Sequence, residues 1–192
     1  MKKLALAATV VGLVALLSFS ASAQGKFALN IGADVMVPLG SFSDAVSIGF
    51  GGTARGEYAF TPQLSGTFRT GYLIWTGKTV NSVDLGNWSG IPLLIGGKYY
   101  FQPEGKMRFY GMAELGLMIL SVSTPEIKVG NIVVVPSGSA SSTEFTIAPT
   151  VGLEVPAGPK ATIDFGVGYM LIASSGSASN ITGRVGYKFL LN

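Results

Sequence analysis

The feature that most constrains the fold of this chain is a recurring alternation of apolar and polar residues. In AVSIGFGGTARGEYAF (45–60), Phe50 and Tyr58 fall on one side, and Arg55 and Glu57 fall on the other. Side chains of a β-strand alternate between its two faces. The segment therefore predicts a strand with one apolar and one polar face.

The same alternation recurs eight times along the chain and predicts an all-β fold. Each predicted strand is about long enough to cross the hydrocarbon layer of a membrane at a tilt of about 45°. The predicted strands cover residues 26–38, 46–60, 64–76, 88–102, 107–121, 143–155, 160–173 and 180–190.

The connections between these strands alternate between tight turns and longer polar segments. TPQ (61–63), PEGK (103–106) and PAGP (156–159) are turns built on proline and glycine. The longer connections are 76–89, 122–142 and 174–180, and the short GSFSD (40–44) falls on their side. This wiring is typical of an eight-stranded antiparallel up-and-down transmembrane β-barrel of a bacterial outer membrane.

Composition indicates that the apolar faces point outward into lipid. Charged residues make up only 12% of the chain, and the mean hydropathy is +0.48. The polar faces therefore carry too little charge to make a soluble, lipocalin-like barrel, which is the alternative that shows the same alternation. Aromatic residues lie near the predicted strand ends at the tight turns, where they suit an interfacial girdle: Phe60, Tyr99, Phe101, Phe109 and Phe189.

The polar faces would then line the lumen with a nearly balanced set of charges. We favour a buried salt-bridge network that plugs the barrel, because an unpaired charge in a low-dielectric interior is costly. The alternative is a narrow or gated conduit lined by the same residues. The candidate lumen network consists of Asp34, Arg55, Glu57, Arg69, Lys98, Arg108, Glu114, Glu154, Asp164, Arg184 and Lys188.

Lys98 is the sharpest test of this interpretation. It lies in IPLLIGGKYYF (91–101), which has no acidic residue. Counting by twos places Lys98 in the lumen, while Tyr99 and Phe101 face lipid. We expect its partner to be Glu114 on the adjacent strand, with Glu57 farther round the wall.

The first 23 residues predict a secretory signal peptide. Lys2 and Lys3 precede an apolar stretch, and Ala21-Ser22-Ala23 forms a cleavage site. Residues 24–192 then form one outer-membrane β-barrel domain. Without the two signal-peptide lysines the remaining charges nearly balance, which argues against nucleic-acid binding.

Three segments resemble a known family. IPLLIGGKYYF (91–101), followed by MRFYGMAELGL (107–117), resembles the central hairpin of small outer-membrane barrels of the OmpX and OmpA transmembrane-domain kind. GYKFLL (186–191) resembles their terminal assembly signal, although Leu190 and the residues after it follow the last aromatic residue. The resemblance implies contact with outer-membrane lipid and insertion by the barrel-assembly machinery.

The absence of histidine and cysteine from the sequence restricts the chemistry of the chain. Sites of the Ser-His-Asp and Cys-His kinds are impossible, and typical zinc and copper sites are not expected. We expect no cofactor and no enzymatic activity, and a monomer with a structural role or a surface-contact role through its extracellular loops. The alternative function is a narrow channel for small or hydrophobic solutes; a soluble ligand-binding barrel ranks third.

The long 122–142 connection is the candidate segment for contact with a surface partner. Gly130-Asn131 lies between two short β-rich runs, which predicts a hairpin. We expect this hairpin to prolong the flanking strands and expose an edge, and SGSASS (137–142) to form a flexible link. An ordered loop without a partner is the alternative.

Overall fold

The computed structural model describes most of the chain as one barrel. The signal peptide predicted for residues 1–23 lies outside the described residues. No helix in the described part of the chain is long and apolar enough to cross a membrane. The described residues are 27–80, 83–84, 86–124, 127–129, 132–135, 138–174 and 178–191.

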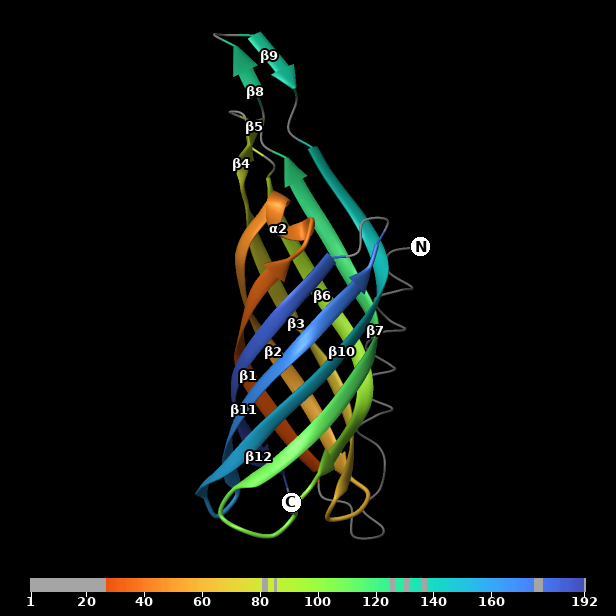
Figure 1. Ribbon diagram of the computed structural model, residues 1–192, viewed down its shortest axis with the longest axis vertical. Helices are drawn as coiled ribbons and strands as arrows, with labels where there is room; N and C mark the ends of the chain where they lie inside the picture. The colour runs from red at the N-terminus through yellow and green to blue at the C-terminus, as the bar shows by residue number, and fades with distance from the viewer. Residues whose placement is uncertain are drawn as a thin grey trace.

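Eight antiparallel strands close into the barrel in the order β1-β12-β11-β10-β7-β6-β3-β2 (Figure 1). Apart from the closing β1–β12 pair, each strand pairs with barrel strands adjacent to it along the chain. The predicted eight-stranded up-and-down barrel is therefore confirmed. Its strands are β1 (Phe27–Leu39), β2 (Val46–Ala59), β3 (Leu64–Gly77), β6 (Asn87–Tyr100), β7 (Arg108–Thr124), β10 (Gly138–Gly158), β11 (Ala161–Ala173) and β12 (Ala178–Leu190).

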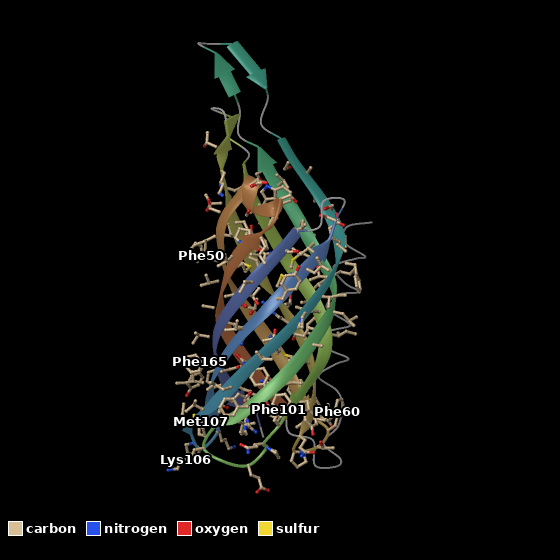
Figure 2. The ribbon with its side chains drawn as sticks, in the orientation of Figure 1. Phe50, Phe60, Phe101, Lys106, Met107 and Phe165 are labelled. Atoms are coloured by element: carbon tan, nitrogen blue, oxygen red, sulfur yellow. The ribbon has the colours of Figure 1, made fainter. Side chains whose placement is uncertain are left out.

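The two ends of the barrel differ as the connections predict. The three tight turns lie at one end, called the turn end below, and Figure 2 shows Phe60, Phe101, Lys106 and Met107 there. The other end, called the loop end, carries a short helix and two small hairpins (Figure 1). These elements are α2 (Phe42–Ala45), β4 (Thr79–Val80) with β5 (Val83–Asp84), and β8 (Ile127–Val129) with β9 (Ile132–Val135).

The alternation assigns the two faces of the wall as predicted. Large apolar side chains are exposed on the outside, among them Phe50, Ile95 and Val167 at 58%, 60% and 60%. Their neighbours at the alternate positions are buried, as Arg55 and Lys98 are. An outer wall of this kind avoids water and suits lipid, so the lipocalin-like alternative is excluded.

The 122–142 connection differs from the prediction. β7 continues to Thr124 and β10 begins at Gly138, and these two residues are register partners. The serine-rich run predicted as a flexible link is therefore mostly strand. A run of serine and alanine shows no clear alternation of apolar and polar residues, so the sequence pattern does not reveal the strand. The backbone groups of these residues nevertheless pair with β7 like those of any other residue.

The predicted hairpin of this connection forms, but not as an extension of the wall. β8 and β9 pair with each other, with Val129 opposite Ile132, and make a separate two-stranded sheet beyond the barrel (Figure 1). The expectation that it prolongs the flanking strands is wrong. Gly130-Asn131, the predicted turn, lies outside the described residues.

Candidate functional site

The candidate site is the lumen, which contains two layers. The layer nearer the turn end, called the ionic layer, holds all eleven charged residues predicted to line the lumen. Ten of them are at most 7% exposed, and the side chain of Arg108 is 27% exposed. The layer nearer the loop end, called the apolar layer, consists of Met36, Phe42, Val46, Leu73, Trp75, Met118, Leu120, Met170, Ile172 and Ala178.

Lys98 occupies the centre of the ionic layer. Its Nζ lies 2.5 Å from Glu154, 3.1 Å from Glu57 and 3.5 Å from Asp164. It also lies 4.0 Å from the ring centre of Tyr110. The ammonium therefore contacts acids from β10, β2 and β11, and a tyrosine face supplements these charges.

The three carboxylates around Lys98 form the kind of group that can hold a metal ion. One oxygen from each of Glu57, Glu154 and Asp164 lies within 4.8 Å of the others. The Lys98 ammonium already supplies positive charge among them. The arrangement therefore satisfies its own charge with a side chain, and the donor set does not require an ion.

Of the two partners predicted for Lys98, Glu57 is confirmed at 3.1 Å, and Glu114 on the adjacent strand is wrong. Glu114 lies opposite Gly96 in the β6–β7 register, and Lys98 lies opposite Met112. Glu114 instead accepts two hydrogen bonds from Arg55, at 2.9 and 3.2 Å. The narrow lumen lets a long side chain reach the far wall, so cross-lumen distance, not strand adjacency, selects the partner of Lys98.

Glu154 connects the residues on the turn-end side of the ionic layer. It accepts hydrogen bonds from Lys188 and Arg108, and from the hydroxyl of Tyr100 at 2.9 Å. Lys188 also lies 3.3 Å from Glu57. Two acids are thus shared among three cations, and no carboxylate in this group lacks a partner.

Asp34 and its neighbours form the opposite face of the ionic layer. Asp34 accepts hydrogen bonds from Arg69 at 2.7 Å and from Thr53 at 2.5 Å. Arg184 donates to Thr53 at 3.1 Å and to Asn30 at 2.9 Å. These contacts join acids, bases and neutral side chains into one network.

Four members of the ionic layer are uncharged and were not among the predicted site residues. Asn30, Thr53, Tyr100 and Tyr110 fall on the polar faces of the sequence pattern, so alternation already assigns them to the lumen. Asn30 and Tyr110 both donate to Asp164, at 2.5 and 2.6 Å. Thr53, Tyr100 and Tyr110 each stand at an inward position two residues from a charged residue, which is a signal that the sequence offers. Asn30 is indicated by its inward position alone.

The apolar layer corrects the expectation of a polar interior along the whole barrel. Trp75, Leu73, Met36 and Met170 are fully buried there. The indole nitrogen of Trp75 donates to Asn180 at 3.1 Å, which satisfies its polar atom. The sequence hides this layer because methionine and leucine at inward positions make both faces of a strand apolar, and the pattern of one strand does not show which residues meet inside the barrel.

Helix α2 covers the apolar layer at the loop end. The ring of Phe42 packs edge-on against Trp75 and Trp88, with centroid distances of 6.0 and 5.6 Å. Lys78, the residue after β3, holds the helix in place. Its Nζ donates to the carbonyl of Ser43 at 2.6 Å, and its backbone N–H donates to the carbonyl of Ala45. The lumen is thus filled by charge at one end and capped by an aromatic residue at the other.

A closed barrel with an apolar outer wall and an ion-paired interior defines the class of integral outer-membrane β-barrels, because closure leaves no unpaired strand edge in lipid. A family model described as the outer membrane protein beta-barrel domain matches residues 6–189. The chain belongs to this family, which places it in the bacterial outer membrane. In such barrels the longer loops face the cell exterior, so the loop end is the extracellular end.

Solved structures share the fold at low sequence identity. Neisserial surface protein A has 16% identity and a TM-score of 0.63, over 87% of this chain and 99% of its own. OprG from Pseudomonas aeruginosa has 12% identity and a TM-score of 0.61, over 88% and 96%. Ail, the attachment invasion locus protein of Yersinia pestis, in complex with the heparin analogue sucrose octasulfate, has 14% identity and a TM-score of 0.55, over 88% and 100%. The comparison with curated proteins gave no match.

Proposed function

We propose that this protein is a non-enzymatic, monomeric outer-membrane barrel that is closed to ions and acts through contacts at its extracellular end. One observation carries the proposal: Lys98 reaches acids on three other strands, so paired side chains span the lumen. A water-filled path through this layer would require separating charges that are buried together, which is costly.

The chemistry of the lumen supports a role without catalysis. The acids of the ionic layer are engaged by arginine, lysine or tyrosine donors, and the sequence contains no histidine or cysteine. A general acid or base needs a carboxylate that a substrate can reach. The carboxylates of the ionic layer are buried against their partners, and their role is to hold the strands of the barrel together.

Export and insertion follow from the same proposal. The predicted signal peptide, residues 1–23, would direct the chain through the inner membrane, and the barrel-assembly machinery would insert residues 24–192. The terminal GYKFLL segment ends β12, which pairs with β1 to close the barrel. The proposed assembly signal therefore lies on the closing strand.

Planar-bilayer recording tests whether the barrel is closed. Purified, refolded protein should give no sustained single-channel steps, while a known porin in the same bilayer gives them. A turn-end variant, Lys106→Gln, should be equally silent, because Lys106 is exposed and outside the ionic layer. Sustained, well-defined steps from the wild-type protein would contradict the proposal.

Deletion of residues 127–135 tests the contact role. This change removes the β8–β9 hairpin and leaves the β7–β10 ladder, which ends at the Gly138–Thr124 pair. Bacteria that display the shortened protein should lose attachment to cell layers and matrix-coated surfaces, while the heat-modifiable mobility of the barrel stays unchanged. Unchanged attachment would defeat the role of the hairpin as the contact surface.

A conduit for small or hydrophobic solutes is the second candidate, and the apolar layer favours it. Apolar side chains beneath the extracellular mouth suit a solute that avoids charge. Liposome swelling with small solutes separates the two proposals. Swelling faster than in protein-free liposomes would favour the conduit.

A further inference from the structure

A pocket of about 390 Å³ lies at the extracellular mouth, above the apolar layer. It opens between α2, the upper parts of β6, β7 and β10, and the β11–β12 connection. A volume in this range accommodates small organic molecules. The pocket belongs to neither the ionic layer nor the β8–β9 hairpin, so the proposed function does not use it.

The walls of the pocket are apolar and partly aromatic. Phe42 and Trp88 meet edge to face. Trp88 lies beside its register partner Val122 of β7, and Leu120 of the same strand continues this wall. Phe42 is held from beneath by Trp75, so this wall is supported by the apolar layer. Such walls can pack against an apolar group of a ligand, and the faces of their aromatic rings can attract a cation.

Glu144 is the one acidic residue among the lining residues. It points inward from β10, two positions above the buried Thr146 and opposite Met118 of β7. Its side chain is half-buried, and no ion pair joins it to any described residue. A half-buried carboxylate without a partner, set among aromatic walls, favours a positively charged ligand group.

The charges around the pocket agree with this preference. No described basic side chain lines the pocket. Lys78, which lies nearby on the α2 side, is engaged by the carbonyl of Ser43. Asp44 of α2 is exposed and adds a second negative charge at the mouth. An anion would meet repulsion here, and a neutral apolar molecule would desolvate Glu144 without pairing it.

We propose that this pocket binds a small organic cation that carries an apolar or aromatic body. The cationic group lies at the Glu144 carboxylate, and the body packs against Phe42 and Trp88. Serine hydroxyls on the rim, including those of Ser142 and Ser174, donate hydrogen bonds to polar substituents of the ligand or accept hydrogen bonds from them.

Tryptophan fluorescence provides a direct test, because the only two tryptophans of the chain are Trp75 and Trp88, and both contact Phe42. The protein is refolded into phosphatidylcholine vesicles and titrated with benzyltriethylammonium, and separately with benzenesulfonate. The cation should give a saturable fluorescence change, and the anion should give none. Binding of the cation should weaken when salt is raised about tenfold, since the charge lies at an open mouth.

Two matched variants locate the charge. Glu144→Gln should weaken binding of benzyltriethylammonium by about fivefold or more, because it removes the charge and keeps the shape. Asp44→Asn, at an acid that does not line the pocket, should change it less than about twofold. Equal affinity in Glu144→Gln and wild type, saturable binding of the anion, no saturation, or insensitivity of wild-type binding to salt would each overturn the proposal. The salt series needs no variant, so a Glu144→Gln protein that fails to refold leaves the test intact.

Discussion

The two layers of the lumen exclude water by different means. In the ionic layer, charged side chains cross the barrel and pair with partners on distant strands, as Lys98 does with Glu57 and Glu154. In the apolar layer, Leu73 and Trp75 fill the same width with no net charge. The pairing of opposite charges depends on each partner being present, while apolar packing depends on filled volume. The two layers should therefore respond differently to substitution.

The largest expected effect is removal of the central cation from the ionic layer. Lys98→Met keeps most of the side-chain volume but leaves three carboxylates without the ammonium between them. We expect a loss of about 4 kcal/mol in the free energy of unfolding, because breaking a buried ion pair leaves uncompensated charge. Urea unfolding in lipid vesicles, followed by gel mobility, measures it.

The control and the partner assignment for Lys98 come from two further comparisons. Lys106→Met, in the exposed PEGK turn, should change stability by less than about 0.5 kcal/mol. In double-mutant cycles, Lys98→Met should couple to Glu154→Gln and much more weakly to Glu114→Gln. Stronger coupling to Glu114 would restore the partner that the sequence predicts and contradict the cross-lumen arrangement.

The next effect belongs to the apolar layer. Leu73 is fully buried, so Leu73→Ala should cost about 3 kcal/mol through lost packing and the cavity that remains. Leu93→Ala is the matched control on the lipid-facing wall, where Leu93 is 38% exposed and the change removes only lipid contact, at about 1 kcal/mol or less. Equal losses at the two leucines would show that the apolar layer is not packed.

A glycine pair on β12 tests how completely the ionic layer fills the lumen. A Cβ at Gly186 would lie 2.3 Å from Oδ1 of Asn30 and 2.5 Å from Nη1 of Arg184, whereas a Cβ at Gly183 meets nothing within 4 Å. Gly186→Ala should therefore cost about 2 kcal/mol by overpacking, and Gly183→Ala should cost nothing. The difference in urea midpoint between the two variants measures it, and equal midpoints would indicate spare room around Arg184.

Alternation predicts which face a residue occupies, and here it succeeds for every charge of the ionic layer. It places Lys98 inside because the rule is local: each residue points opposite to its neighbour. It does not predict that Lys98 pairs with Glu154, because that contact crosses the lumen and depends on strand tilt and barrel width. The ion-pair partner of a lumen residue can therefore be predicted only from the closed barrel. The order of the strands along the chain predicts the wrong partner for Lys98.

The division of the lumen into an ionic layer and an apolar layer cannot be predicted from the sequence for a related reason. Met36, Met118 and Met170 stand at inward positions of strands that also carry inward acidic residues. Each strand alone shows only one or a few apolar residues at these positions, and only the closed barrel brings them to the same height. The mouth pocket is hidden likewise, since Phe42 comes from α2, Trp88 comes from β6, and the two meet only in the fold.

The smallest expected effect distinguishes hydroxyl groups that serve the ionic layer from one that does not. Thr53 donates to Asp34 at 2.5 Å and accepts from Arg184 at 3.1 Å, so Thr53→Val should cost about 1.5 kcal/mol. Among the described residues, the buried Thr146 hydroxyl has no hydrogen-bond partner, so Thr146→Val should leave stability unchanged or raise it by less than about 1 kcal/mol. Both changes keep the volume of the side chain, and urea unfolding compares them directly. A loss at Thr146 equal to that at Thr53 would mean that the Thr146 hydroxyl is hydrogen-bonded in the membrane, and the boundary of the polar network would move toward the mouth.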